Sequence, residues 1–127
     1  MPKVVNPVDV SREENEAKKD YFDRHTPHVF CEDNAIKGKP FKVTLKLGKD
    51  YPHPDDYDHF IQYAQLWDRE MMLAEASFTA GAMGNVPGHV EVIFTIVPTR
   101  KMNLSAMSFC TKHGLWQSES KEVAVTE

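Results

Sequence analysis

The 127-residue sequence has only two cysteines and no apolar run that approaches the roughly 20 residues needed to cross a bilayer. It also lacks a basic surplus, since 15 Lys and Arg face 19 Asp and Glu, for a formal net charge of −4. A chain without such a surplus is poorly suited to neutralise the phosphates of a nucleic acid. We therefore expect neither a membrane-spanning helix nor a nucleic-acid partner, and two cysteines do not make a disulfide scaffold.

The first twenty residues, MPKVVNPVDVSREENEAKKD, lack the apolar stretch of a signal peptide. This predicts a cytoplasmic protein whose cysteines stay reduced and act as ligands, nucleophiles or core residues. The composition is that of a globular protein, with 41% apolar and 27% charged residues. A chain of this length can bury an adequate core as one domain.

Alternating apolar and polar residues predict mostly β-structure. The segment FKVTLKL (41–47) alternates strictly, as expected for a half-buried antiparallel strand. β-branched and aromatic content predicts further strands after Pro27 and at 60–67, 73–80, 89–97, 104–110 and 121–125. The Ser-x-x-Glu start of residues 11–22 is typical of a short helix. The prediction is an all-β sandwich or small barrel, preceded by an arm or short helix over residues 1–21.

Five side chains with metal-binding chemistry lie in predicted loops or at strand ends: His25, His53, His59, Cys110 and His113. We expect His25 to be held extended before a proline, at the mouth of a strand. Each residue alone has an ordinary explanation as a solvated histidine or a small buried thiol. Together, four imidazoles and one thiolate suit a transition metal rather than calcium or magnesium, which take oxygen ligands.

The kind of metal follows from the number of ligands. A blue copper site would use two histidines and one cysteine and would leave two histidines over. A closed structural zinc site takes four ligands and tends to use Cys-x-x-Cys pairs, which this sequence lacks. Five nitrogen and sulfur ligands favour iron with one open position. A metal-free immunoglobulin-like binding module stays open as an alternative.

Three segments, HTP, YPHPDDYDHFIQY and FCTKHGLW, resemble the signature segments of superoxide reductases, which comprise the one-iron neelaredoxins and the iron-binding domain of desulfoferrodoxins. The resemblance spans residue 22 to about residue 117. It implies an immunoglobulin-like antiparallel β-sandwich of about seven strands over 22–127. The cysteine pairs of the family's additional N-terminal iron module do not occur here, so the resemblance implies one mononuclear non-haem iron per chain.

The resemblance also implies roles for individual residues. His25, His53 and His59 would bind iron through their outer nitrogens, His113 through the nitrogen nearer its backbone, and Cys110 through its thiolate. The reaction would be the reduction of superoxide by one electron and two protons to hydrogen peroxide, with a rubredoxin-like donor and a dimeric or tetrameric assembly. A non-catalytic electron-transfer protein of the same fold is the alternative. Cys31 is expected to be a buried free thiol, and His28 and His89 partly exposed histidines.

The chain departs from the family pattern immediately before His25. The family reads Glu-Lys-His, whereas this chain reads Asp23-Arg24-His25. The family glutamate occupies the sixth position of ferric iron, but Asp23 is one methylene shorter. Arg24 keeps the positive charge of the family lysine, although a guanidinium does not act as an acid in proteins. Both residues remain candidates for catalytic roles, against the alternative that they form only a surface ion pair.

Overall fold

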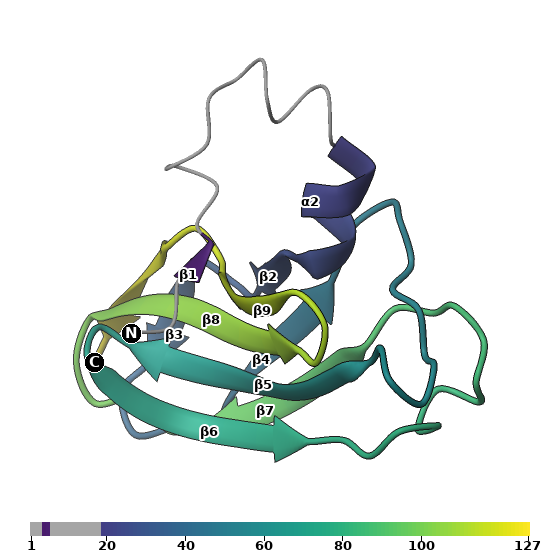
Figure 1. Ribbon diagram of the computed structural model, residues 1–127. Coiled ribbons are helices and arrows are strands. Elements are labelled where there is room, and N and C mark those ends of the chain that lie inside the picture. Colours follow the sequence, from purple (N-terminus) through teal and green to yellow (C-terminus); the bar gives the residue numbers. More distant parts are fainter. Residues whose placement is uncertain (1–3, 6–18) are drawn as a thin grey trace.

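The computed structural model describes residues 4–5 and 19–127, which form a β-sandwich with one short helix at its edge (Figure 1). Its elements in chain order are β1 (Val4–Val5), α2 (Lys19–His25), β2 (Pro27–Phe30), β3 (Asn34–Ile36), β4 (Phe41–Leu47), β5 (Ile61–Asp68), β6 (Met71–Ser77), β7 (Glu91–Ile96), β8 (Met102–Cys110), β9 (Gly114–Gln117) and β10 (Lys121–Thr126).

The strands form two sheets. The smaller has the order β2-β4-β7, and the larger contains β1-β9-β8-β10-β3, with β5 on the other edge of β8 and β6 beyond β5. Most neighbours are antiparallel, and the short pairs β1–β9 and β10–β3 are parallel. The predicted antiparallel sandwich is confirmed. The described residues form ten strands rather than about seven, because the short strands β1, β3 and β9 escaped the sequence analysis.

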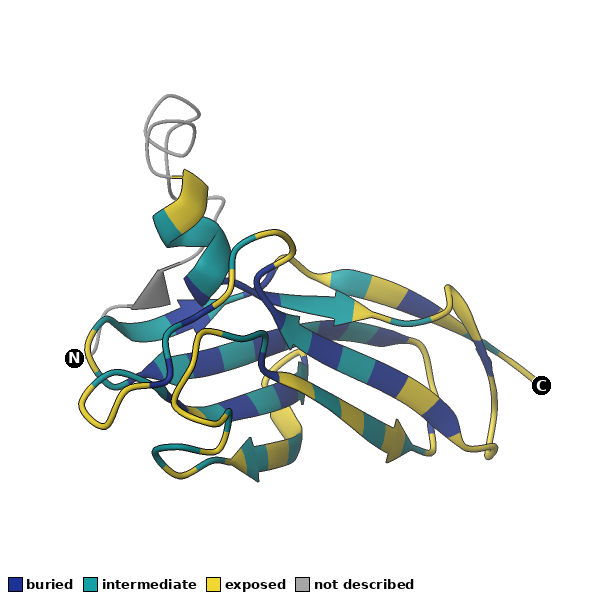
Figure 2. Ribbon diagram, turned by 90° about the vertical axis from the view of Figure 1, so that its right-hand side faces the viewer, coloured by how far each residue is buried: buried dark blue, intermediate teal, exposed yellow. Residues whose placement is uncertain are grey.

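The core lies between the two sheets and follows from the alternation of each strand. Along β8 every second residue is buried, from Met102 to Cys110, and β4 shows the same alternation from Phe41 to Leu47 (Figure 2). Leu45, Leu66 and Leu104 have no exposed surface. Burying side chains of this size contributes about 1.5–3 kcal/mol each, so these alternating strands stabilise the sandwich.

Strand registers bring several strand ends to one end of the sandwich. The first residue of β2, Pro27, lies opposite the last residue of β4, Leu47. The first residue of β5, Ile61, lies opposite the last residue of β8, Cys110, which also pairs with Gly114 at the start of β9. Segments far apart in the sequence therefore meet at this end of the sandwich, beside α2 (Figure 1).

The N-terminal part differs from the prediction. The structure places a helix at Lys19–His25, and residues 11–18 of the predicted helix lie outside the described residues. His25 ends this helix and is not extended, because Thr26, not His25, directly precedes Pro27. The helix also spans the predicted boundary between the N-terminal arm, 1–21, and the sandwich domain, 22–127. That boundary stays a prediction. In the described part of the chain, no helix is long and apolar enough to span a membrane.

Candidate metal centre

The five predicted ligand residues come together at the end of the sandwich where the strand ends meet. One potential ligand atom from each of His25, His53, His59 and Cys110 lies within 4.8 Å of all the others. His113 adjoins this group, since its Nδ1 is 3.1 Å from His25 Nε2 and 3.7 Å from Cys110 Sγ. The cluster therefore combines four imidazoles and one thiol from three separate segments.

The end of α2 positions His25. The His25 Nδ1–H donates to the Tyr21 carbonyl at 2.7 Å, one helical turn earlier. Ser108 on β8 donates its hydroxyl to the His25 carbonyl at 3.3 Å, which ties the helix to the larger sheet. The indole of Trp116 stacks on the imidazole at a centroid distance of 4.8 Å and an interplanar angle of 17°. His25 is thereby held from its backbone, its inner nitrogen and one ring face.

His53 and His59 lie in the loop before β5. The His53 Nδ1–H donates to the Pro54 carbonyl at 2.6 Å, and the His53 backbone exchanges two hydrogen bonds with Gly88. His59 pairs in the same way with Asp56. Since carbonyls accept the inner N–H of both His25 and His53, the outer Nε2 of each neutral ring carries a lone pair into the cluster.

A buried carboxylate that the sequence analysis missed supports this loop. Asp55 is 3% exposed, and it accepts hydrogen bonds from the backbone amides of Gly81, Met83 and Asn85. It thereby joins the loop that carries His53 to the turn before Gly88. Nothing in the sequence separates Asp55 from the neighbouring Asp56 and Asp58, because its role depends on amides some thirty residues later.

Cys110 is fully buried and lies 3.3 Å from His53 Nε2. Burial raises the pKa of its thiol, an effect that the backbone N–H groups of Lys112 and His113 and the Lys112 charge partly oppose. Backbone donors that point at sulfur favour the thiolate over the thiol. The turn after β8 is thus arranged to stabilise the negative sulfur that a metal ligand requires.

The histidines of the cluster are neutral. Burial lowers the pKa of His25 to about 3, although the bond to Tyr21 opposes the shift and the neighbouring histidines add to it. Burial likewise lowers the pKa of His53 to about 4, with smaller contributions from His59, His113 and Arg24. The pKa values of His59 and His113 are also lowered, first by burial; His113 and then Lys112 add to the shift of His59, and Lys112 adds to that of His113.

The donor set fits a transition metal. His59 Nε2 is buried without a hydrogen-bond partner among the described residues, and His59 is one of the four residues whose potential ligand atoms converge. A buried imidazole nitrogen without a partner costs free energy that a bound cation would recover. Neutral imidazoles with hydrogen-bonded inner nitrogens, together with a thiol supported by backbone amides, are what such a cation requires.

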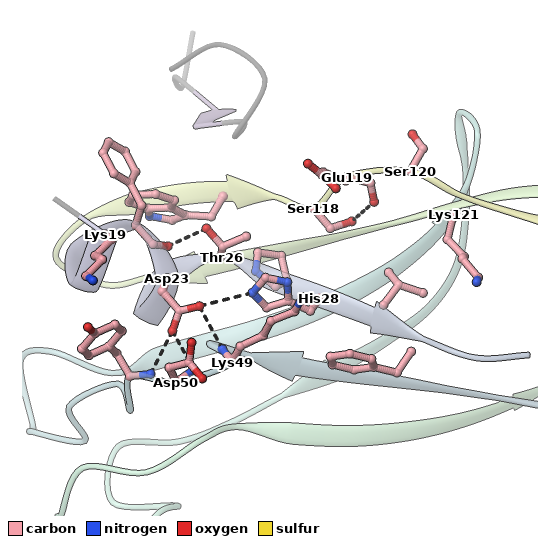
Figure 3. A pocket seen from close by; sticks show the side chains of 16 residues that line it. Lys19, Asp23, Thr26, His28, Lys49, Asp50, Ser118, Glu119, Ser120 and Lys121 are labelled. Atoms are coloured by element: carbon pink, nitrogen blue, oxygen red, sulfur yellow. Dashed lines mark hydrogen bonds and ion pairs between the residues drawn. The ribbon is translucent and has the colours of Figure 1, made fainter. Parts of the chain in front are cut away.

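Asp23 and Arg24 lie beside the cluster rather than in it. The Asp23 carboxylate accepts the backbone N–H groups of Lys49, Asp50 and Tyr51 at 2.8–3.0 Å and lies 3.7 Å from His28 Nε2 (Figure 3). Burial alone would raise its pKa, but these donors hold the pKa below its ordinary value. Ligation of iron by Asp23 would require these bonds to break.

Arg24 contacts Asp20, one helical turn away. Its Nε–H donates a hydrogen bond to the Asp20 carbonyl, and one guanidinium nitrogen lies 3.5 Å from the Asp20 carboxylate. The ion pair considered in the sequence analysis, between Asp23 and Arg24, is therefore not the one that forms. Figure 3 shows the pocket of about 540 Å³ that Asp23 lines. Three lysines and three carboxylates line this pocket, and none of the five predicted ligand residues does.

The remaining histidines and the second cysteine lie apart from the group of potential ligand atoms. His28 and His89 are partly exposed as predicted, and His89 Nδ1–H donates to the Leu47 carbonyl at 3.1 Å. Cys31 is free, as predicted, but it is only half-buried, which corrects the expectation of a buried thiol. Cys31 directly follows Phe30, the exposed last residue of β2.

Comparison with known proteins agrees with this geometry. The family model of desulfoferrodoxin matches residues 13–119. The chain belongs to the desulfoferrodoxin family. It is 32% identical over 116 residues to neelaredoxin of Megalodesulfovibrio gigas, a match that covers 81% of this chain and 88% of that protein. It is 30% identical over 110 residues to superoxide reductase of Pyrococcus furiosus, with coverages of 76% and 86%.

A solved structure leads to the same family. A variant of the superoxide reductase (neelaredoxin) from Ignicoccus hospitalis superposes with a TM-score of 0.76 at 28% identity. The match covers 97% of this chain and 94% of that one. The predicted membership of the superoxide reductase family is thus confirmed by the family model, by relatives and by fold.

The neutral histidines predict how the metal-free protein responds to acid. An unfolded histidine titrates near about 6.5, so between about pH 6.5 and 4 the unfolded chain binds protons that folded His25 and His53 exclude. The free energy of unfolding should therefore fall as the pH drops through this window. Urea unfolding of the metal-free protein at several pH values measures it. His53→Gln should show a weaker pH dependence, and an equal one would contradict a buried neutral imidazole at residue 53.

The bonds of Asp23 predict the effect of its removal. Asp23→Ala leaves three backbone N–H groups without their acceptor, so the free energy of unfolding should fall by about 1–3 kcal/mol. Hydrogen exchange at Lys49 and Tyr51 should become faster. Asp50→Ala, a neighbouring exposed carboxylate, is the matched control and should change neither measurement. Unchanged protection of the Tyr51 amide in Asp23→Ala would contradict the anchoring role.

Proposed function

We propose that this chain is a superoxide reductase, which reduces superoxide by one electron and two protons to hydrogen peroxide. The observation that carries the proposal is the convergence of His25, His53, His59, Cys110 and His113 in a chain of the desulfoferrodoxin family. The match with two relatives named superoxide reductase covers 86% and 85% of their lengths, which supports the proposal.

The proposed cofactor is one mononuclear non-haem iron per chain, held by the four imidazoles and the Cys110 thiolate. Iron cycling between its ferrous and ferric forms would supply the electron, and five ligands leave one position of a six-coordinate ion for substrate. His25, His53 and His59 would bind through Nε2 and His113 through Nδ1, the atom that faces Cys110 and His25. Two backbone N–H groups on the Cys110 sulfur would moderate how strongly it donates to the metal.

Two cations flank the cluster and are proposed to attract the superoxide anion. The Arg24 charge is close enough to lower the pKa of His53, after the larger effect of burial. The Lys112 charge acts in the same way on His59 and His113, and Lys112 lies in the exposed turn between Cys110 and His113. A lysine ammonium can also release a proton, which a guanidinium does not do in proteins. Lys112 is thus proposed to supply the positive charge and the proton donor that the family lysine, replaced here by Arg24, would have supplied.

Asp23 is assigned an anchoring role in this proposal, since its carboxylate holds the backbone of residues 49–51. The electron would come from a rubredoxin-like donor, and the protein would act as a homo-oligomer. A reducing cytoplasm is the proposed compartment, and the free thiols of Cys31 and Cys110 support it.

The first test of the proposal concerns metal and colour. The protein purified from its native host should contain one iron per chain, and its oxidised form should show a sulfur-to-iron charge-transfer band in the visible. Cys110→Ser should abolish the band because it removes the thiolate. Cys31→Ser is the matched control and should keep it. A band that survives in Cys110→Ser would contradict the assignment of the Cys110 thiolate as an iron ligand.

The same experiment separates ligand from non-ligand histidines. Alanine at His25, His53, His59 or His113 should reduce iron retention, whereas His28→Ala and His89→Ala should retain iron and band alike. Zinc in recombinant protein would not count against the proposal, because zinc outcompetes ferrous iron for such ligands.

The second test concerns electrostatic attraction. Arg24→Glu and Lys112→Glu should each slow the second-order reaction of the reduced protein with superoxide by about tenfold at low salt, because the anion then approaches a carboxylate. The difference should shrink at about 1 M salt, where the screening length is roughly 3 Å. Pulse radiolysis measures both rates.

Lys42→Glu is the matched control, since this exposed lysine lies on the outer face of the smaller sheet near the start of β4, at the opposite end of the strand from Leu47 and the metal centre, and should leave the rate unchanged. Unchanged kinetics in both Arg24→Glu and Lys112→Glu at low salt would show that neither cation guides the substrate. Lys112→Arg keeps the charge but removes an ammonium proton donor. It should restore the superoxide reaction and slow only steps that depend on proton delivery.

A further inference from the structure

The pocket shown in Figure 3 follows the free edge of β2, and the proposed reaction does not use it. The smaller sheet has the order β2-β4-β7, so in the described part of the chain β2 pairs with β4 on one side and with no strand on the other. Every residue of β2, from Pro27 to Phe30, lines the pocket, and the segment 118–121 lines another wall. We call this pocket the edge groove.

The pairing of β2 with β4 leaves the backbone of Val29 unused. Leu47, which lies opposite Pro27, donates its N–H to the Val90 carbonyl at 2.9 Å, on the side away from β2. Hydrogen-bonded and non-bonded pairs alternate along an antiparallel ladder. Val29, two residues after Pro27, is therefore also in a non-bonded pair, and its N–H and C=O point to the free edge of the sheet.

These two backbone groups define the kind of ligand that fits. Among the described residues, no turn or loop forms a backbone hydrogen bond with Val29, which is half-buried. An N–H and a C=O that point the same way are matched by one residue of an extended chain, which exchanges two hydrogen bonds with them. A small anion would satisfy the N–H and leave the carbonyl without a donor. The free edge therefore favours a peptide backbone over a small ion.

The end of the edge groove beside α2 offers ammonium groups. Lys19 and Lys49 line this end (Figure 3), and neither forms an ion pair with another described residue. The Asp23 carboxylate at the same end already accepts three backbone N–H groups. Asp50 is the one other carboxylate that lines this end. Two ammonium groups therefore face one unengaged carboxylate here, which favours a negative group of the ligand.

The other end of the edge groove is acidic. Lys121 lies there (Figure 3), but its ammonium group is already paired with Asp33. Glu119 lines the same wall. Burial raises the pKa of the Cys31 thiol, the Lys121 charge lowers it, and Asp33 and Glu32 raise it further, so these charges lie around the end of β2. Three carboxylates and one cation at this end favour a positive group of the ligand.

We propose that the edge groove binds an extended peptide segment of a partner protein, which adds to β2 as an antiparallel strand. The residue opposite Val29 shares its face and is apolar, because Val29 packs against the core. Antiparallel addition places the C-terminal end of the segment beside Lys19 and Lys49 and its N-terminal end beside Glu119 and Glu32. The segment is therefore basic at its N-terminal end and acidic at its C-terminal end.

The inference does not depend on the proposed reaction, because none of the five predicted metal ligands lines the edge groove. Fluorescence anisotropy with the purified full chain tests it. The probe is the peptide Lys-Thr-Val-Thr-Glu with a free C-terminal carboxylate and a fluorophore on an N-terminal linker. Binding should be saturable below about 1 mM. A peptide that shows no saturable binding in this range would overturn the proposal.

A second probe distinguishes strand addition from attraction between charges. The same peptide with an N-methylated valine keeps every charge but cannot donate to the Val29 carbonyl. Its dissociation constant should be at least about tenfold higher, because a hydrogen bond is lost and a carbonyl stays unpaired. Equal binding of the two peptides would overturn the assignment of the free edge of β2 as the binding site.

Val29→Pro removes the outward N–H, which the ladder with β4 does not use, and should also raise the dissociation constant at least about tenfold. Ile93→Pro is the matched control on β7, the other edge of the same sheet. Ile93 is 59% exposed, and the variant should leave the dissociation constant unchanged. An effect of Ile93→Pro as large as that of Val29→Pro would overturn the proposal.

Lys49→Glu gives a second variant if Val29→Pro fails to fold, as judged by circular dichroism. It places a carboxylate beside the C-terminal end of the peptide and should raise the dissociation constant about fivefold at low salt. Lys42→Glu, the same charge change at the far end of β4, should leave it unchanged. Equal effects of Lys49→Glu and Lys42→Glu would overturn the proposed orientation of the segment in the edge groove.

Discussion

The pairing of β5 with β8 is the constraint on which the metal centre depends. The strands are antiparallel, so the start of β5 and the end of β8 coincide, with Ile61 opposite Cys110. Alternation along β8 turns Cys110 into the core, and the loop that enters β5 brings His59 to the same point. A slip of one residue would turn Cys110 to the outer face and separate the thiol from the imidazoles. The bulge at Gln62 lets Ile61 and Tyr63 face opposite sides while this register is kept.

The buried histidines impose a second requirement, on protonation. A charged imidazole beside three others in a desolvated cluster is unfavourable, and the low pKa values of His25 and His53 reflect this. Each of these rings gives its inner N–H to a backbone carbonyl, so the tautomer that presents Nε2 is selected before any metal binds. The acceptors are main-chain groups, and a substitution of Tyr21 or Pro54 would therefore leave the carbonyl in place.

The sequence predicted the strands well because their alternation is local. The segment 41–47 matches β4 at both ends, and the five ligand candidates, singled out by chemistry and resemblance, do converge. The failures came where tertiary contacts decide. His25 was expected to be extended, but a helical bond to Tyr21 and the tie to Ser108 hold it at the end of α2. The strand β9 has only four residues and owes its conformation to pairing with β8.

Asp55 shows why parts of the site were invisible in the sequence. Its segment, YPHPDDYDHFIQY, contains three aspartates, and only the fold reveals which one is buried against the amides of Gly81, Met83 and Asn85. The same holds for Asp23, whose partners lie more than 25 residues later. A carboxylate with three backbone donors has no local signature, because the donors belong to whichever turn the fold brings near it.

Asp23 and Asp55 solve the same physical problem in two loops. Loops near a buried site expose backbone N–H groups that no strand ladder satisfies, and each unpaired buried donor costs free energy. One carboxylate accepts three such donors at once and fixes the loop without side-chain packing. The loop that supplies His53 and the loop next to α2 are therefore ordered by the protein itself. A short carboxylate at residue 23 suits this purpose, because a longer, more mobile side chain would hold the amides less firmly. At residue 23, where the family resemblance implies a glutamate, this chain thus carries an aspartate that orders a loop.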